Sequence, residues 1–227
     1  MPKAVLLSIK PQYCEPIASG KKTIEVRKTR PKLQPLFKCY IYCTQGDKLW
    51  VTTERERFFC NGKVASIINA KDVGGCYLGN SKVIGEFVCD FVNEYTAEFV
   101  DDYCYEDIRQ VFRESDGDSG EVIITSNEDD NPSNCYLCTA SCLSFGEIKK
   151  YIGVNFYEKP FYGWHISDLK IYETPKELGE FWKAGKCPYA SENGCTYEYY
   201  CFRAGQTNRC GETLTCPPQS WCYVENE

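Results

Sequence analysis

The sequence lacks a hydrophobic run that could cross a membrane, which would need roughly 18 or more consecutive apolar residues. The opening stretch MPKAVLLSIKPQ holds about six apolar residues before Lys10 and Pro11 interrupt it, which is not typical of a secretory signal peptide. We therefore expect a soluble, cytoplasmic protein with no membrane partner.

An excess of positive charge is also missing, because 26 Lys and Arg stand against 32 Asp and Glu, for a formal net charge of −6. This balance argues against a generic basic coat for nucleic acid. Residues 1–40 nevertheless carry nine Lys and Arg against Glu15 and Glu25, a net of +7 that leaves −13 for the remainder. Such asymmetry is compatible with one basic face on an acidic body, and equally with a solvated basic surface that has no partner.

Histidine and methionine are nearly absent, with one of each, whereas hydrophobic residues make up 43% and aromatic residues 15% of the chain. This composition is that of a folded globular protein and excludes disorder of the whole chain. A length of 227 residues favours one domain of about 150 residues plus an appendage.

Cysteine, in contrast, is abundant, with sixteen residues. In a secreted chain this number would indicate up to eight disulfides, whereas in a reducing cytoplasm cysteines are thiols or metal ligands. The expected location favours thiols or a metal site.

The hydrophobic pattern predicts short strands with helices between them. A continuous apolar run predicts a buried strand at AVLLSI. A short helix is expected at PQYCEPIAS, which begins at Pro11 and ends before Gly20. The alternating pattern of TIEVR predicts another strand. Further strands are expected at 37–44, 64–69, 82–92 and 164–172. Helices are expected after the Ser144–Glu147 capping box, over 105–114, and after the start signal Thr174, Pro175 and Glu177.

Two segments are predicted to be irregular. Residues 115–134 are acidic and rich in turn-forming residues, which is typical of a surface excursion. Residues 185–216 contain five cysteines and little apolar periodicity, so they need something other than a hydrophobic core to hold them.

The stretch GKKTIEVR at residues 20–27 carries charge on a predicted strand. Glu25 and Arg27 share one face, and Lys22 precedes it. Burying an unpaired charge costs several kcal/mol, so this face either lines a wet cleft or pairs with other groups. An exposed edge strand whose charges deter aggregation is the alternative.

The segment LLSIKPQYCEPIASGKKTIEVR resembles the opening of ASCH domains, which are relatives of PUA-like and EVE modules. It carries their G-x-K-x-x-E-x-R motif as Gly20, Lys22, Glu25 and Arg27. KVIGEFVCD, FYGWHISDLKIYETPKEL and PPQSWCYVE also look like the group found in bacterial and prophage genomes. The resemblance spans residues 3–178 and 217–225.

The resemblance implies an α+β fold built on a small PUA-like β-barrel with helical decorations. Its cleft would take RNA, single-stranded nucleic acid or a modified nucleobase. We expect an ASCH domain over 1–178, a cysteine-rich insertion over 179–216, and a C-terminal strand over 217–227 that returns to the barrel. The cleft would be framed by the residues Ser8, Lys10, Lys22, Glu25, Arg27, Trp164 and His165.

Some relatives are amidohydrolases that deacetylate acetylcytidine with a lysine, a threonine and a distal glutamate. Lys22 matches the lysine, but Glu25 stands where the threonine is expected. In a hydrolase or a ribonuclease, Lys22 would carry the proton and Glu25 would orient or activate a water. A third possibility is a protein–protein adaptor that does not bind nucleic acid.

Basic and aromatic residues would supply the remaining nucleic-acid contacts. Lys10, Lys28 and Arg30 would meet phosphates, which position a ligand without reading its sequence. Trp164, His165 and Trp221 would stack on unpaired bases. Core tryptophans and a structural histidine are the alternatives.

The cysteine-rich segment is the second candidate site. Four thiolates, from Cys187, Cys195, Cys201 and Cys210, would hold a structural zinc that supplies the missing folding energy. Their spacing contains no C-x-x-C pair, so unligated thiols and air-formed disulfides stay open as alternatives. The C-x-x-C pair Cys135 and Cys138, followed by Cys142, is a further possible ligand set.

Overall fold

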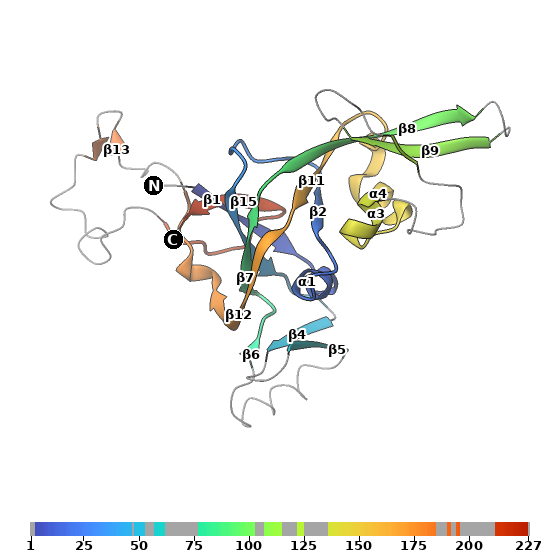
Figure 1. Cartoon of the computed structure of the whole chain (residues 1–227). Helices are drawn as coiled ribbons and strands as arrows, with labels where there is room; N and C mark the ends of the chain where they lie inside the picture. Colours follow the sequence, from blue (N-terminus) through green and yellow to red (C-terminus); the bar gives the residue numbers. More distant parts are fainter. Residues whose placement is uncertain are drawn as a thin grey trace. The chain divides into compact units, whose positions relative to one another are not determined.

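The structure is a computed structural model that describes residues 3–46, 48–52, 57–61, 77–102, 107–114, 122–124, 136–184, 190–191, 194–195 and 212–226 (Figure 1). The chain forms two compact units. Unit 1 contains Met1–Glu15, Phe37–Phe87 and Lys170–Glu227, and unit 2 contains Pro16–Leu36 and Val88–Leu169.

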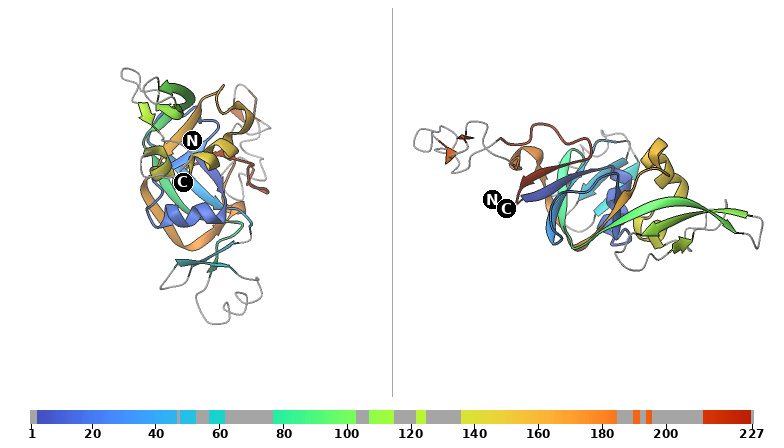
Figure 2. Two further views of the ribbon diagram at one scale, coloured as in Figure 1. Left: turned by 90° about the vertical axis from the view of Figure 1, so that its right-hand side faces the viewer. Right: turned by 90° about the horizontal axis from the view of Figure 1, so that it is seen from above.

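A five-stranded sheet forms the body of unit 1, in the order β12-β7-β3-β1-β15 (Figures 1 and 2). The last two residues of β7 and the first three of β12 belong to unit 2. The bounds of these strands are Lys3–Ile9 (β1), Phe37–Cys43 (β3), Lys82–Cys89 (β7), Ser167–Glu177 (β12) and Trp221–Glu225 (β15).

Strand β1, an interior strand of this sheet, is buried along most of its length, which agrees with its continuous apolar run. It pairs in parallel with β3 and antiparallel with β15. Its side chains enter a core that includes Leu6, Tyr40, Phe181 and Val224. The parallel pairing requires a long crossover connection, and α1 and β2 lie in the chain between β1 and β3.

Smaller elements complete the described part of unit 1. Three short strands form a separate sheet in the order β5-β4-β6, and β13 pairs with β14. Their bounds are Lys48–Thr52 (β4), Arg57–Asn61 (β5), Tyr77–Leu78 (β6), Ala190–Ser191 (β13) and Gly194–Cys195 (β14), and the 3-10 turn η4 covers Leu178–Glu180.

Unit 2 is built on a five-stranded antiparallel sheet in the order β10-β9-β8-β11-β2. The bounds are Ile24–Arg27 (β2), Val92–Asp102 (β8), Asp107–Glu114 (β9), Val122–Ile124 (β10) and Phe161–His165 (β11). Strand β11 lies between β2 and β8, so it holds the charged motif strand beside the longest strand of this sheet.

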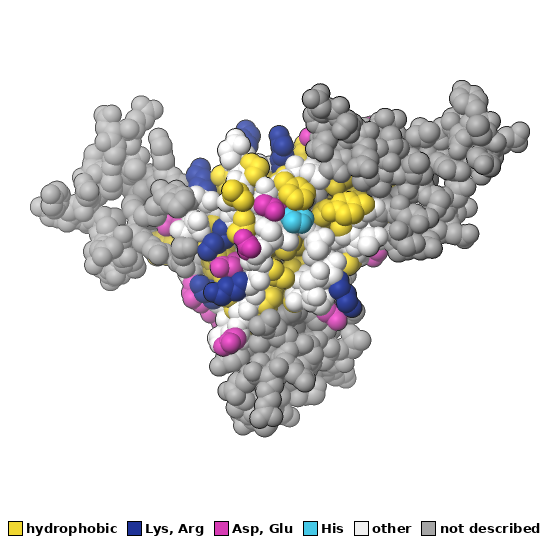
Figure 3. All heavy atoms as spheres, viewed as in Figure 1, with side chains coloured by type: hydrophobic (Ala, Val, Ile, Leu, Met, Phe, Trp, Pro, Cys, Tyr) yellow, Lys and Arg dark blue, Asp and Glu magenta, His cyan; other side chains and the backbone are white. Residues whose placement is uncertain are grey.

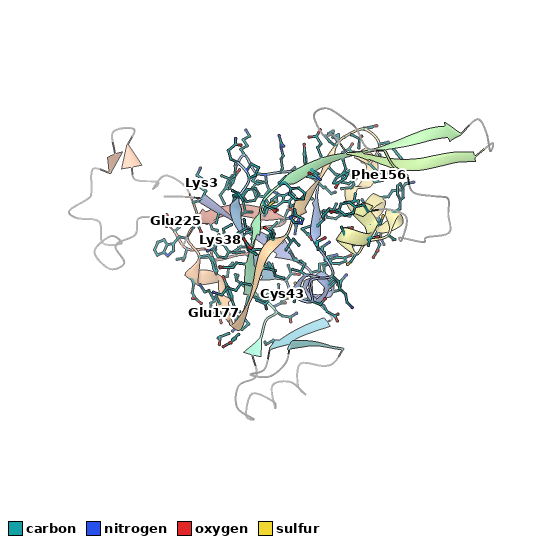
Figure 4. All side chains as sticks on the ribbon, viewed as in Figure 1. Lys3, Lys38, Cys43, Phe156, Glu177 and Glu225 are labelled. Atoms are coloured by element: carbon teal, nitrogen blue, oxygen red, sulfur yellow. The ribbon has the colours of Figure 1, made fainter. Side chains whose placement is uncertain are left out.

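Helices α3 (Tyr136–Ser141) and α4 (Phe145–Ile152), with the turn η3 (Gly153–Asn155), pack on one face of this sheet. The shared core includes Ile24, Tyr95, Leu137, Ile148 and Phe156, the last of which is labelled in Figure 4. The predicted capping box is present in α4, since Ser144 and Glu147 each accept a backbone hydrogen bond from the other.

The structure confirms the predicted α+β class, with mixed and antiparallel sheets and few helices among the described residues. The strands at AVLLSI, TIEVR, 37–44 and SWCYV are also confirmed. So is the first helix, as α1 (Pro11–Ala18), which is followed by Gly20 at φ +73°. The predicted strand at 164–172 is divided between β11 and β12, and the one at 82–92 between β7 and β8.

Two helix predictions were wrong. Asp107–Glu114, in the segment predicted as a helix over 105–114, forms β9 and pairs with β8 along its whole length. The start signal at Thr174, Pro175 and Glu177 instead lies at the end of β12 and is followed by a single 3-10 turn. The predicted strand at 64–69 lies outside the described residues, and the predicted domain boundaries remain predictions.

No helix in the described part of the chain is long and apolar enough to span a membrane.

Candidate functional site

The charged motif lies in unit 2 on a tightly defined piece of backbone. Gly20 adopts φ +73°, a left-handed conformation that glycine tolerates, and its N–H donates to the carbonyl of Ile17. The chain then passes Lys22 and enters β2, where Glu25 is opposite Trp164 and Arg27 is opposite Tyr162. Strand β2 is an edge strand of its sheet, but both of its faces are buried, so the exposure that the edge-strand alternative predicted is wrong.

Glu25 connects the two cations of the motif. Its Oε1 lies 2.9 Å from Arg27 Nη2, and its Oε2 lies 3.2 Å from Lys22 Nζ. Lys22 Nζ also donates to the carbonyl oxygen of Ser141, the last residue of α3, at 2.7 Å. Lys22 is 2% exposed, Glu25 7% and Arg27 5%. Burying these charges has a large desolvation cost, and their pairing with one another compensates part of it.

This network links β2 to α3 within unit 2. It brings an amine and a carboxylate together, which are the groups assigned to proton transfer from the sequence. Those catalytic roles remain predictions.

The other residues predicted to frame a cleft are distributed over both units. Ser8, on β1 in unit 1, donates its hydroxyl to the carbonyl of Pro218 at 2.6 Å, and Lys10 is an exposed residue after that strand. Trp164, on β11 in unit 2, is fully buried and so presents no exposed ring to a base. His165 is partly exposed, with Nδ1 2.6 Å from Asp90 Oδ1.

Lys28 and Arg30 lie where the chain leaves β2, and both line a pocket in unit 2 with a volume of ≈ 410 Å³. Lys159, which precedes β11, adds a third cation, and Asn155 adds an amide. The full lining is Lys28, Thr29, Arg30, Ile152, Asn155, Lys159, Pro160 and Tyr162. The pocket therefore combines three cations with neutral hydrogen-bonding groups and a partly apolar wall.

Aromatic rings accompany these cations. The Arg30 guanidinium lies over the ring of Tyr162 at 5.7 Å, and Lys28 Nζ lies over the ring of Tyr151 at 5.5 Å. Tyr151, on α4, is 40% exposed. Cation–π contacts of this kind hold flexible basic side chains near a defined position.

The phenol of Tyr162 stays protonated, because burial raises its pKa above the usual range. The negative charge of Glu94 and a hydrogen bond to it raise the pKa further, whereas Arg30 lowers it. Glu94 is directly opposite Tyr162 in the pairing of β8 with β11. An acidic group therefore borders this basic pocket, and the single O–H of Tyr162 is donated to it.

Sequence reasoning found Lys28 and Arg30 but missed Asn155, Lys159 and Tyr162. These residues are about 130 positions away along the chain, and only the pairing of β2 with β11 brings them together. The dipeptide Lys159-Pro160 before a β-rich run was the available signal, and it is a weak one.

The predicted zinc ligands Cys187, Cys201 and Cys210 lie outside the described residues, and for Cys195 the structure describes the backbone alone, in β14. Among the side chains that are described, no group of three or more His, Cys, Asp or Glu is arranged to hold a metal ion. The zinc site therefore remains a prediction.

Comparisons with known proteins give little further information. No family model matches the chain, and no curated protein matches it. Among solved structures, the chain is similar to the crystal structure of a mutant of ZmASCH from Zymomonas mobilis, with 14% sequence identity and a TM-score of 0.41, over 78% of this chain and 77% of that one. A likeness this distant supports no conclusion about function.

Proposed function

We propose that this protein binds single-stranded RNA or a related single-stranded nucleic acid, and that the pocket of unit 2 holds its phosphates. The observation that carries the proposal is the convergence of Lys28, Arg30 and Lys159 on a pocket of ≈ 410 Å³. A volume of this order suits a nucleotide-sized ligand.

The chemistry of the pocket matches a phosphodiester. The Arg30 guanidinium offers a planar pair of N–H donors, and the two lysines add point charges. Thr29 and Asn155 offer neutral donors to the same oxygens. Such contacts fix the backbone of a ligand but do not read its sequence.

Tyrosine rings among the cations favour a single strand over a duplex. Lys28 lies over Tyr151, Arg30 over Tyr162, and Lys149 over Tyr157, all within unit 2. Proteins that bind single strands combine a basic path with rings on which unpaired bases stack. The resemblance of the G-x-K-x-x-E-x-R segment to ASCH domains also supports a nucleic-acid ligand.

The direct test is the affinity of the purified protein for a fluorescently labelled single-stranded RNA, measured by anisotropy at low salt. We expect the double variant Arg30→Gln, Lys159→Gln to bind about tenfold or more weakly, because it removes two charge-assisted contacts. Lys176→Gln is the matched control: Lys176 lies in unit 1 over the ring of Tyr172, in a cation–π contact like that of Arg30. Equal loss in both variants, or no RNA binding by the wild type, would contradict the proposal.

A hydrolytic function of the motif is the second candidate, because Lys22 Nζ and the Glu25 carboxylate lie 3.2 Å apart. Incubation with acylated nucleosides and a short RNA, read by mass spectrometry, tests it. Product that is formed by the wild type and lost in a Lys22→Ala variant that remains folded would establish an enzyme. RNA binding without any product would leave a binding protein, and the absence of both would favour the adaptor.

A further inference from the structure

Two aromatic rings are stacked at the surface of unit 2. Phe91 precedes β8 and His165 ends β11, and their rings are nearly parallel, with an interplanar angle of 11° and centroids 4.3 Å apart. Phe91 is 38% exposed even though the imidazole covers one of its faces. The exposed area therefore lies outside the face that the imidazole covers.

Several contacts fix this pair in place. The carbonyl oxygen of Phe91 accepts a hydrogen bond from the His165 backbone N–H at 3.1 Å and another from the Cys89 thiol at 3.2 Å. His165 Nδ1 lies 2.6 Å from Asp90 Oδ1, which sets the orientation of the imidazole. The rings thus form a rigid surface, which loses little conformational entropy when a ligand binds.

Polar groups lie at the edge of this surface. The Asp90 side chain is 32% exposed and the His165 side chain 24% exposed, so both remain accessible to a ligand. Figure 3 shows the imidazole, in cyan, at the surface, with acidic and hydrophobic side chains around it. A flat ring that carries N–H groups could stack on Phe91 and donate a hydrogen bond to Asp90 at the same site.

We propose that Phe91, His165 and Asp90 form a stacking site for an unpaired nucleobase. The base lies on the exposed face of Phe91, and the Asp90 carboxylate accepts a hydrogen bond from an exocyclic amine or ring N–H at its edge. This inference rests on the proposed function, because it assigns a base contact to the same ligand whose phosphates occupy the basic pocket. It also predicts binding of a base that carries no phosphate.

His165 gives a direct readout because it is the single histidine of the chain, so its imidazole signals in an NMR spectrum need no assignment. We expect adenosine and cytidine to shift these signals, because the Asp90 carboxylate that contacts His165 Nδ1 would gain a hydrogen bond from the base. Inorganic phosphate should leave the signals in place. Nucleosides that fail to shift the imidazole at any accessible concentration would overturn the inference.

A variant pair tests the role of the ring. Phe91→Ala removes the platform, and Phe91→Leu keeps an apolar side chain without a planar face. We expect both to bind a short single-stranded RNA roughly 5- to 150-fold more weakly than the wild type, the range for losing one stacked base. Circular dichroism and thermal unfolding establish that the variants are folded, and Phe91 is exposed enough that we expect them to be.

An abasic oligonucleotide of the same length distinguishes the two proposals. The two proposals are both supported if binding of this strand is weakened by substitution of Arg30 and Lys159 and is unchanged by substitution of Phe91. RNA binding that is equally strong in Phe91→Ala, together with an unshifted imidazole, would overturn the stacking site and leave the phosphate pocket standing. Nucleoside shifts without any oligonucleotide binding would support the stacking site and remove the phosphate pocket.

Discussion

At the scale of single residues, Glu25 is the residue whose substitution we expect to lower the free energy of unfolding most. It lies between Lys22 and Arg27, and all three side chains are at least nine-tenths buried. A buried ion pair adds little net stability compared with apolar packing, but removing one partner leaves a buried charge without compensation. Two cations depend on this one carboxylate.

Glu25→Gln should therefore lower the free energy of unfolding by about 3–5 kcal/mol, measured by urea denaturation. Glu177→Gln is the matched control, because Glu177 pairs with Lys82 at 2.6 Å but its side chain is 63% exposed. Loss of that surface pair should cost no more than about 1 kcal/mol. Similar losses in the two variants would contradict the burial of the motif.

A second prediction at this scale concerns the Cys89 thiol. Burial raises its pKa from 9.0 to about 12, and the neighbouring Asp90 charge adds to the effect. The unfolded chain ionises first, so the stability that this thiol contributes is fully present below pH 9 and is lost as pH rises toward 12.

The wild type should consequently lose more stability than Cys89→Ala between about pH 8 and about pH 10, as read from urea midpoints. The comparison with Cys89→Ala removes the effects of other groups, including Cys222, whose pKa burial raises to about 11. Parallel curves for the two proteins would count against a buried, protonated thiol.

At the scale of elements, local patterns predicted the structure where neighbouring strands did not compete with them. The apolar run of β1, the turn at Gly20 and the capping box of α4 all formed as expected. The segment that forms β9 has helix-forming residues, but its pairing with β8 overrides that preference. Pro175 predicts a helix start, yet it lies in β12, an edge strand of its sheet, where a missing N–H is tolerated.

The candidate site was predictable in part for the same reason. Lys28 and Arg30 lie next to a recognisable motif in the chain. Lys159, Tyr162 and Phe91 come from distant segments that strand pairing brings into unit 2, and the weak Lys159-Pro160 signal is the local pattern that marks them. Trp164 was predicted to stack on a base, but its side chain is fully buried.

Glycine at position 163 is required by the packing of β11. A Cβ there would lie 2.8 Å from Tyr95 Cε2 and 2.9 Å from Ile24 Cγ2, both in the core of unit 2. Gly163→Ala should lower the free energy of unfolding by about 1–3 kcal/mol. A Cβ at Gly146, in α4, would meet nothing within 4 Å. Gly146→Ala should therefore raise the free energy of unfolding by about 0.4–1 kcal/mol. A Gly163→Ala protein as stable as the wild type would contradict this close packing.

The cysteine-rich segment carries a prediction of its own. If Cys187, Cys195, Cys201 and Cys210 hold a structural zinc, protein purified without chelators should contain one zinc per chain by elemental analysis. Cys201→Ser should lose the metal, and Cys142→Ser, at an exposed position outside the segment, should retain it. Zinc-free wild-type protein would remove this assignment.

At the scale of the whole molecule, the distribution of charge limits how the protein would bind the proposed polyanion. The chain carries a net charge of −6, yet three cations converge on the pocket of unit 2. General attraction to nucleic acid is therefore weak, and affinity must come from a small number of local contacts. The acidic remainder would disfavour non-specific coating of long strands.

The salt dependence of RNA binding tests this account most directly. For a single strand, the slope of log K against log salt concentration is about −0.7 for each phosphate neutralised, so contacts from Lys28, Arg30 and Lys159 predict a slope near −2. Lys159→Gln should bring the slope about 0.7 closer to zero. Binding whose slope is unchanged by Lys159→Gln, or that does not respond to salt, would contradict phosphate recognition by this pocket.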